Sequence, residues 1–366
     1  MFRHIQSPVL AGFLSVLAFF GTAQVAKAQD NVEANDLDAI IEQLHALSPH
    51  ADATSLSFTR WNADGQVSAT CAGCHTTSGF LDRMGADGTA RGTVEHPVPI
   101  GETVTCAACH TPTAEQMLPV AFPSGAIYDH GLASASCLSC HQGRTSADTV
   151  ATATAAIESD DTVSPDLRFI NIHYAPAAVL LGSEARGGFE YPERDYAGRF
   201  AHVEGFTTCT DCHNPHSLEV SAAPCAACHG DVALDAIRLG SPDMDGDGDT
   251  AEGVSAEIHA LHAALGTAIA DYAAAYGGAI AYAKGFPYFF NDSNGNGLVD
   301  EAERNRENAY SGFTPRLLRA AYNYQVIATD PSAWSHNARY AGQLLHDSIA
   351  DLASTGATPA LPGDRP

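Results

Sequence analysis

The chain has 366 residues and is strongly acidic, with 18 Lys and Arg against 43 Asp and Glu and a formal charge of −25. Such a surface repels nucleic acid and anionic membrane faces, and it favours basic partners or dissolved cations. Apolar residues make up 45% of the chain, as in ordinary folded proteins, so general disorder is excluded. Ten cysteines are too few for a small disulfide scaffold, and their spacing must therefore show what they do.

Residues 1–28 have the pattern of a secretory signal peptide. Arg3 supplies a positive start, Val9 to Phe20 form an apolar run too short to span a bilayer comfortably, and Ala26-Lys27-Ala28 is a small-residue cleavage site. The alternative is an uncleaved anchor. No later stretch of the sequence is apolar enough to cross a membrane, so we expect a secreted protein of the periplasm, the cell surface or the cell exterior.

Every cysteine lies in one of five Cys-x-x-Cys-His motifs. Two thiols at this spacing lie on one side of a helical turn, where they can add to the two vinyl groups of one haem, and the next His can bind the iron as proximal ligand. Zinc knuckles would not need a His after each motif, a thioredoxin-like site would occur once, and disulfides at this spacing would close only tiny loops. We therefore predict five covalent haem c groups. The predicted attachment residues are Cys71, Cys74, His75, Cys106, Cys109, His110, Cys137, Cys140, His141, Cys209, Cys212, His213, Cys225, Cys228 and His229.

The motifs are crowded between residues 71 and 229. A haem is a large apolar disc, so at this density the haems must pack on one another and replace much of the usual side-chain core. The last two motifs, which begin at Cys209 and Cys225, should carry neighbouring haems. The long gap between Cys140 and Cys209 must hold extra structure.

The composition favours a second histidine for each iron, because the chain has 17 His and only 4 Met. Bis-His ligation gives lower reduction potentials than His/Met ligation. His202, His130 and His96 each lie shortly before a motif, and the short segment that carries each of them can fold over the far face of a haem. His216 follows its own motif too closely for that and is expected to serve a neighbouring haem. The predicted distal ligands are His50, His96, His173, His202, His216 and His336, so six candidates compete for five places.

Helical periodicity dominates the second half of the chain, in Ser255 to Tyr276, after Pro315 and after Asp330-Pro331. A short amphipathic helix is predicted within residues 37–47, and His259 and His262 are expected to flank the apolar seam of their helix. Strand alternation is scarce. We therefore predict a mainly α fold with extensive irregular loops and few strands, organised by stacked haems. The expected regions are an N-terminal helix and arm (29–66), a pentahaem domain (67–235) and a helical C-terminal region with calcium loops (236–366).

Two acidic loops have the spacing of calcium sites. Residues 292–303 match a twelve-residue EF-hand-type loop with Gly297 at its sixth position and a closing glutamate. Its predicted ligands are Asp292, Asn294, Asn296, the Leu298 carbonyl, Asp300 and Glu303. A second loop departs from the full pattern, because its closing acid falls at position ten. The alternative for this loop is a solvated acidic turn. Its predicted ligands are Asp243, Asp245, Asp247, Asp249 and Glu252.

Several segments carry a resemblance to a known family. The segments Cys140 to Arg144, Phe169 to Tyr174, Gly205 to Val220 and Thr314 to Tyr324, together with the acidic loops, resemble the secreted multihaem c-type cytochromes of bacterial periplasmic and extracellular electron transfer. The resemblance extends over nearly the whole chain after the signal peptide. It favours His336 over His130, and it implies sixth ligands at His50, His173, His202, His216 and His336.

Three functions remain open at this stage. The first is an electron carrier that exchanges electrons with redox proteins or with an extracellular acceptor, without turnover of a substrate. The second is a reductase of nitrite, hydroxylamine or a sulfur oxyanion, which would need an open iron site; all five motifs end in His, and none is a variant that would mark a special haem. The third is a homo-oligomer or haem filament, which would need haems at both ends of the subunit.

Overall fold

The computed structural model describes residues 36–366, except residues 113–116, 118, 130, 174, 175, 239, 241 and 362. The predicted signal peptide and His130 lie outside the described residues. The fold is mainly helical with irregular connections, as predicted. Residues 36–46 are helical. The further helices are α2 (Leu56–Thr59), α3 (Ala69–His75), α4 (Thr77–Arg83), α5 (Cys106–Cys109), α6 (Leu132–His141), α7 (Ala147–Thr154), α8 (Ala178–Leu181), η2 (Gly182–Glu184), α9 (Cys209–Cys212), α10 (Ala226–His229), η3 (Leu234–Ala236), α11 (Val254–Tyr276), α12 (Pro315–Ala328) and α13 (Ala333–Ala353).

The strands are short and form antiparallel pairs. They are β1 (Gln66–Val67) with β2 (Val98–Pro99), β3 (Val120–Ala121) with β4 (Ile127–Tyr128), and β5 (Ile280–Tyr282) with β6 (Phe289–Asn291). Two-stranded ribbons are marginal on their own, so these ribbons depend on the surrounding chain. Among the described residues, no helix is both long enough and apolar enough to cross a membrane.

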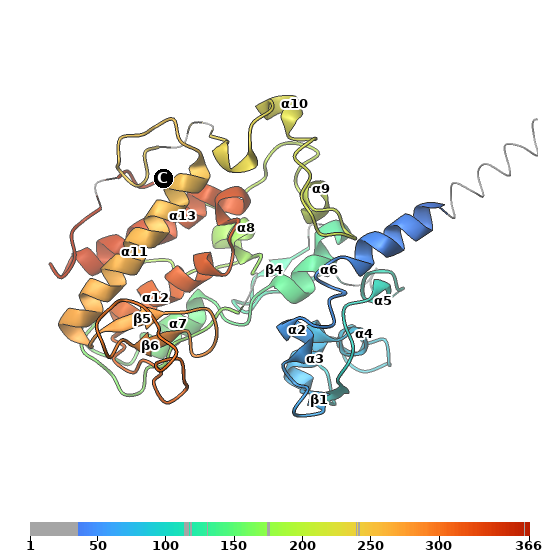
Figure 1. The fold of residues 1–366 in the computed structure, drawn as a ribbon, viewed down its shortest axis with the longest axis horizontal. Coiled ribbons are helices and arrows are strands. Elements are labelled where there is room, and N and C mark those ends of the chain that lie inside the picture. The colour runs from blue at the N-terminus through green and yellow to red at the C-terminus, as the bar shows by residue number, and fades with distance from the viewer. Residues whose placement is uncertain are drawn as a thin grey trace, which may run out of the picture.

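The main core lies between α11, α12 and α13, which form one side of the molecule in Figure 1. Leu265, Leu317 and Tyr340 are fully buried there, one from each helix. Burying a large apolar side chain stabilises a fold by about 1.5–3 kcal/mol. Thr314 starts α12 because its side-chain oxygen accepts a hydrogen bond from Leu317 N (3.1 Å), and Pro315 fills the first turn, where no N–H is needed.

The long gap between the third and fourth motifs supplies part of this core. The buried Asn323 side chain bonds both main-chain groups of Phe189, accepting from its N (2.7 Å) and donating to its O (2.9 Å). Tyr322 donates to Gly187 O (2.8 Å). These bonds join the gap between the third and fourth motifs to α12 in the helical core (Figure 1).

Candidate haem-binding site

One large cavity, of about 3140 Å³, is lined by the cysteines and histidines of all five motifs. Pockets for single ligands usually have about 300–1,000 Å³, so this cavity has room for several large ones. The apolar clusters beside it are small, as in the group around Phe80 and Leu138. The chain around the motifs therefore encloses a space and does not fill it with side chains.

A short helical turn positions the two thiols of each motif. In the fourth motif, His213 N donates to Cys209 O (2.8 Å), which closes the turn. Asp211 caps this turn by accepting from the main-chain N of Thr207 (2.9 Å) and Thr208 (2.7 Å). The same closing bond joins the ends of the second and fifth motifs. The local sequence thus presents two thiols and one imidazole on one side of the chain.

Each motif histidine lies opposite a second histidine. If two imidazoles bind one metal with bonds of about 2 Å and ring centres about 1 Å further out, the ring centres lie about 6 Å apart. The observed distances between ring centres agree with this expectation. They are 5.9 Å for His75 and His173, 6.2 Å for His110 and His216, 6.3 Å for His141 and His50, 6.4 Å for His213 and His336, and 5.9 Å for His229 and His202.

These pairs join parts of the chain that are remote in sequence. His50 precedes the first motif but lies opposite the third, and His216 follows the fourth motif but lies opposite the second. His202 stands just before the fourth motif yet faces the fifth. His96 is exposed and does not line the cavity, so of the six distal candidates it is the one that the structure leaves away from a motif histidine.

Main-chain carbonyls hold two of the motif rings. His75 Nδ1 donates to Ser57 O (2.9 Å), and His213 Nδ1 donates to Leu218 O (3.1 Å). Such bonds fix which ring nitrogen carries the proton and leave Nε2 free to bind a metal. His173 instead has a strained backbone, with φ of +86°, and its N donates to Asn171 Oδ1 (2.8 Å). Strain of this kind persists where the surroundings hold it, often at functional sites.

The histidines of the cavity differ in their proton affinity. Burial lowers the pKa of His50 to about 4 and, with the neighbouring His75, that of His173 to about 4. Burial also acts to lower the pKa of His336, but a hydrogen bond and the charge of Asp330 outweigh it and raise that pKa. Neutral imidazole is the form that binds metals, so His50 and His173 are ready as ligands at neutral pH.

Helix α6, which carries the third motif, touches three other motifs. Cys140 lies close enough to Cys74 of the first motif to lower the pKa of that thiol to about 6, and Cys137 likewise lowers the pKa of Cys209 of the fourth motif to about 6. The charge of Cys109 in the second motif contributes to raising the pKa of both α6 cysteines. Burial raises the pKa of Cys109 itself and Ser136 of α6 acts to lower it, so the second motif also lies near α6. The third motif is therefore adjacent to the first, the second and the fourth.

Further contacts support this arrangement. Arg83, which follows the first motif, donates to Ser139 O (2.9 Å) and to Cys74 Sγ (3.3 Å), while Cys209 N donates to Ser134 Oγ (3.2 Å). Burial raises the pKa of Cys212 in the fourth motif, and the charge of Cys225 raises it further, so the fifth motif lies near the fourth.

Hydrogen bonds within the loop 292–303 hold carboxylate oxygens that could bind a cation. Asp292 Oδ2 accepts from Gly297 N (2.8 Å), where φ is +77°, a conformation that glycine adopts easily. Glu303 Oε1 accepts from Ser293 N (2.7 Å) and Oε2 accepts from Asp300 N (3.2 Å), which joins the two ends of the loop. These hydrogen bonds lower the pKa of Glu303, so it is charged at neutral pH.

The second acidic loop contains a residue that the sequence analysis missed. Glu257, from α11, is fully buried and lies with Asp243 and Asp245 in a group whose oxygens come within 4.8 Å of one another. Its Oε2 accepts from Met244 N (2.8 Å), and Arg238 Nη1 lies 2.6 Å from its Oε1. A helix position outside the loop carries no loop-spacing signal, although a glutamate on the buried side of α11 is itself unusual. Glu252 groups with Asp245 and Asp247.

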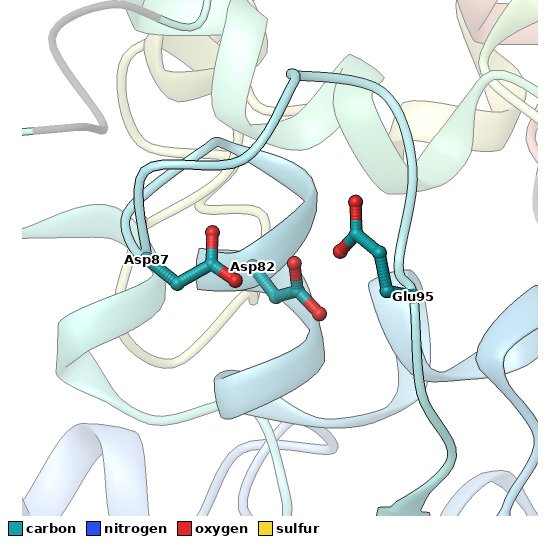
Figure 2. Close-up of side chains that lie close together, drawn as sticks. All are labelled: Asp82, Asp87 and Glu95. Atoms are coloured by element: carbon teal, nitrogen blue, oxygen red, sulfur yellow. The ribbon is translucent and has the colours of Figure 1, made fainter.

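A third carboxylate cluster, Asp82, Asp87 and Glu95, lies beside α4 (Figure 2). Thr89 Oγ1 donates to Asp87 Oδ1 (2.8 Å) and to Glu95 Oε2 (3.4 Å). Burial and the adjacent Glu95 raise the pKa of Asp82. Local hydrogen bonds account for this cluster, and we assign no ion to it.

Comparisons with known proteins agree with the chemistry of the motifs. The chain is similar to the C-type polyheme cytochromes OmcB and OmcC of Geobacter sulfurreducens, with 27% identity over 81% of this chain in each case. It spans less than half of either relative, covering 46% of OmcB and 44% of OmcC. No family model and no solved structure matches. The similarity, like the five motifs, supports a multihaem c-type cytochrome of electron transfer.

Proposed function

We propose that this chain is a pentahaem c-type cytochrome that passes electrons between redox partners through five bis-His haems. The observation that carries the proposal is the pairing of all five motif histidines with a second histidine inside one cavity. The proposed distal ligands are His173, His216, His50, His336 and His202, in the order of the motifs whose histidines they face. His96 has no place in this assignment.

The residues of the chain fit this chemistry. Bound haem supplies a one-electron iron couple, and thioether bonds from the two motif cysteines keep it in place. Two histidines on each iron leave no position for a substrate, which favours electron transfer over reduction of a small oxyanion. The cavity keeps the five groups together, and the helical core keeps the cavity in shape.

The contacts of α6 support a branched order of haems. We propose that the third haem is a junction that adjoins the first, the second and the fourth, and that the fifth follows the fourth. This order rests on the hydrogen bonds of α6 with Arg83 and with Cys209 N, and on the proximity of Cys140 to Cys74, of Cys137 to Cys209, and of Cys109 to both α6 cysteines. Because each thiol marks an edge of its haem, adjacent thiols indicate adjacent haem edges.

We also propose structural calcium in the loop 292–303, held by Asp292, Asn294, Asn296, the Leu298 carbonyl, Asp300 and Glu303. Hard cations prefer such oxygen donors. For the second loop we propose Asp243, Asp245, Asp247 and Glu252, with Glu257 added from α11, whereas the predicted ligand Asp249 belongs to neither carboxylate group. Arg238 already neutralises Glu257, so the second loop should bind calcium more weakly.

The site of action is proposed from the sequence. The signal-like segment 1–28 favours export, and the acidic charge favours basic redox proteins as partners. An extracellular electron acceptor is the alternative partner.

Haem stoichiometry and electron paramagnetic resonance test the proposed function. We expect five haems per chain and only low-spin signals in the oxidised protein. Replacement of any one proposed distal histidine by alanine should convert one haem to high spin, whereas His96→Ala should leave all five low-spin. Three or fewer haems, or a substantial high-spin signal in the unmodified protein, would contradict the proposal.

A further inference from the structure

We propose that Asp330 sets the reduction potential of the fourth haem by holding the Nδ1–H of His336 against a buried carboxylate. The inference rests on the proposed function, because it takes His336 as the distal ligand opposite His213. It assigns to Asp330 a positioning role, since the carboxylate acts through the imidazole and does not touch the iron.

The geometry of the contact is specific. His336 Nδ1 lies 2.8 Å from Asp330 Oδ2 and 2.9 Å from Oδ1, so the ring N–H meets both carboxylate oxygens. The ring centre of His336 lies 6.4 Å from that of His213, with both residues on the cavity wall. With Nδ1 engaged by the carboxylate, Nε2 is the nitrogen left to bind a metal.

The carboxylate is held in place by its own surroundings. Asp330 is 5% exposed. Its N donates to Ile327 O (3.1 Å) at the end of α12, and its O accepts from Ala333 N (3.0 Å) at the start of α13. Its Oδ1 also accepts from Ser332 N (3.3 Å). Within the described part of the chain, no Arg or Lys forms an ion pair with Asp330, so no basic side chain competes with His336 for its carboxylate.

The other held rings of the cavity provide a contrast. His75 and His213 donate from Nδ1 to neutral main-chain carbonyls. A carboxylate draws the shared proton more strongly, which makes the imidazole a stronger donor to the iron. A stronger donor and a nearby negative charge both stabilise ferric over ferrous iron. The potential of this haem is therefore lowered relative to what a main-chain partner would give.

The consequence for electron flow follows from the order proposed above. The fourth haem lies between the junction haem and the fifth, so its potential controls passage between the fifth haem and the other three. A carboxylate at this position gives the chain a local means to set that step.

Potentiometric titration of holoprotein variants tests the proposal. Asp330→Asn keeps the size of the side chain and removes its charge, and we expect one of five midpoint potentials to rise while the other four stay. Asp330→Ser is a second variant that keeps an oxygen for Ser332 N, and it should give the same shift. Asp330→Glu restores the charge and should return the potential towards that of the parent protein. Asp347→Asn is the matched control, because Asp347 is a buried carboxylate of α13 that pairs with Arg365 away from the cavity.

Ligation is measured separately in the same proteins. His336→Ala should convert one haem to high spin, and the Asp330 variants should keep all five low-spin with an altered signal for one. If all five potentials stay unchanged in both Asp330→Asn and Asp330→Ser while His336→Ala gives a high-spin haem, Asp330 has no tuning role although the ligand assignment holds. If His336→Ala leaves five low-spin haems, the ligand assignment itself is wrong.

Discussion

His202 and His229 lie in an exposed part of the proposed site. His202 is exposed and His229 is half-buried, with their ring centres 5.9 Å apart. Because the chain around them is open, a substitution of His202 should disturb packing less than one at His173 or His336. This pair is therefore suited to a direct test of the pairing.

We predict that His202→Met raises the potential of one haem, that of the fifth motif, and leaves the other four little changed. A thioether ligand gives a higher potential than an imidazole. The measurement is a redox titration followed by visible absorption, with His96→Met as the matched control, since His96 is also exposed but lies away from the cavity. No rise for any haem, or an equal rise in the His96 variant, would contradict the pairing.

At the scale of residues, the sequence alone predicts a proximal set, whereas the pairing of the histidines depends on the fold. A Cys-x-x-Cys-His turn is local, so its five copies are visible in the sequence. The partner of each motif depends on packing between distant segments, such as that which brings His50 to His141 and His216 to His110. The expectation that His216 serves a neighbouring haem agrees with its place opposite His110, whereas no local pattern relates His202 to the fifth motif.

At the scale of elements, the long helices and the helical turns of the motifs were predictable, whereas the other short helices were not. The apolar spacing from Ser255 to Tyr276 corresponds to α11, and the proline signals correspond to the starts of α12 and α13. The segment 144–163, which is rich in Thr, Ala and Asp and whose sequence is compatible with a solvated helix or a loop, forms α7 (Ala147–Thr154) followed by a loop. Four-residue helices outside the motifs, such as α2 and α8, span barely one turn, so they carry no periodicity that a sequence pattern could reveal.

We predict that calcium raises the melting temperature of the protein and that Glu303→Ala removes most of this increase. Glu303 ties both ends of its loop, and the loop connects β6 to α12. Calcium that binds only the folded loop stabilises the fold by mass action. Thermal unfolding with calcium and with chelator measures the effect. Glu301→Ala is the matched control, because Glu301 is exposed in the same loop and lies outside the ligand pattern.

The outcome also separates the two acidic loops. A small calcium response that survives in Glu303→Ala and disappears in Asp245→Ala would come from the second loop. An undiminished calcium response in Glu303→Ala would contradict calcium binding in the loop 292–303.

At the scale of the whole molecule, the motifs are not arranged in the order of the sequence. The gap that separates the third and fourth motifs packs into the helical core through Gly187 and Phe189, and the chain then returns to place Cys209 beside Cys137. A linear order of haems would follow from spacing alone. The branched order that we propose instead depends on the contacts of α6, which only the folded chain brings together.

The chain offers one convenient place to inject electrons near the first haem. Lys284 is the single lysine after residue 28, and it is exposed on the cavity wall. It belongs to the turn that ends at Tyr288, whose hydroxyl accepts from Asn171 Nδ2 (3.0 Å), close to the His173 that faces His75. A photoreductant coupled to Lys284 should therefore reduce the first haem before the others, and Lys284→Arg controls for labelling at other amines.

The branched order predicts which haem can be removed without blocking electron transfer from the first haem to the fifth. The substitution His202→Met makes the fifth haem distinguishable from the others. Electrons injected by flash at Lys284 should still arrive at the fifth haem at nearly the parent rate in Cys106→Ala/Cys109→Ala, which lacks the second haem. Electron transfer to the fifth haem should slow by at least about tenfold in Cys137→Ala/Cys140→Ala, because the junction haem is then missing and the remaining haem edges are farther apart. A tenfold loss corresponds to about 1.4 kcal/mol of added barrier. Low-spin signals from the four remaining haems in each variant show that the fold survives. A linear order requires the opposite result for the second motif, so transfer that stops when the second haem is removed would refute the junction at α6.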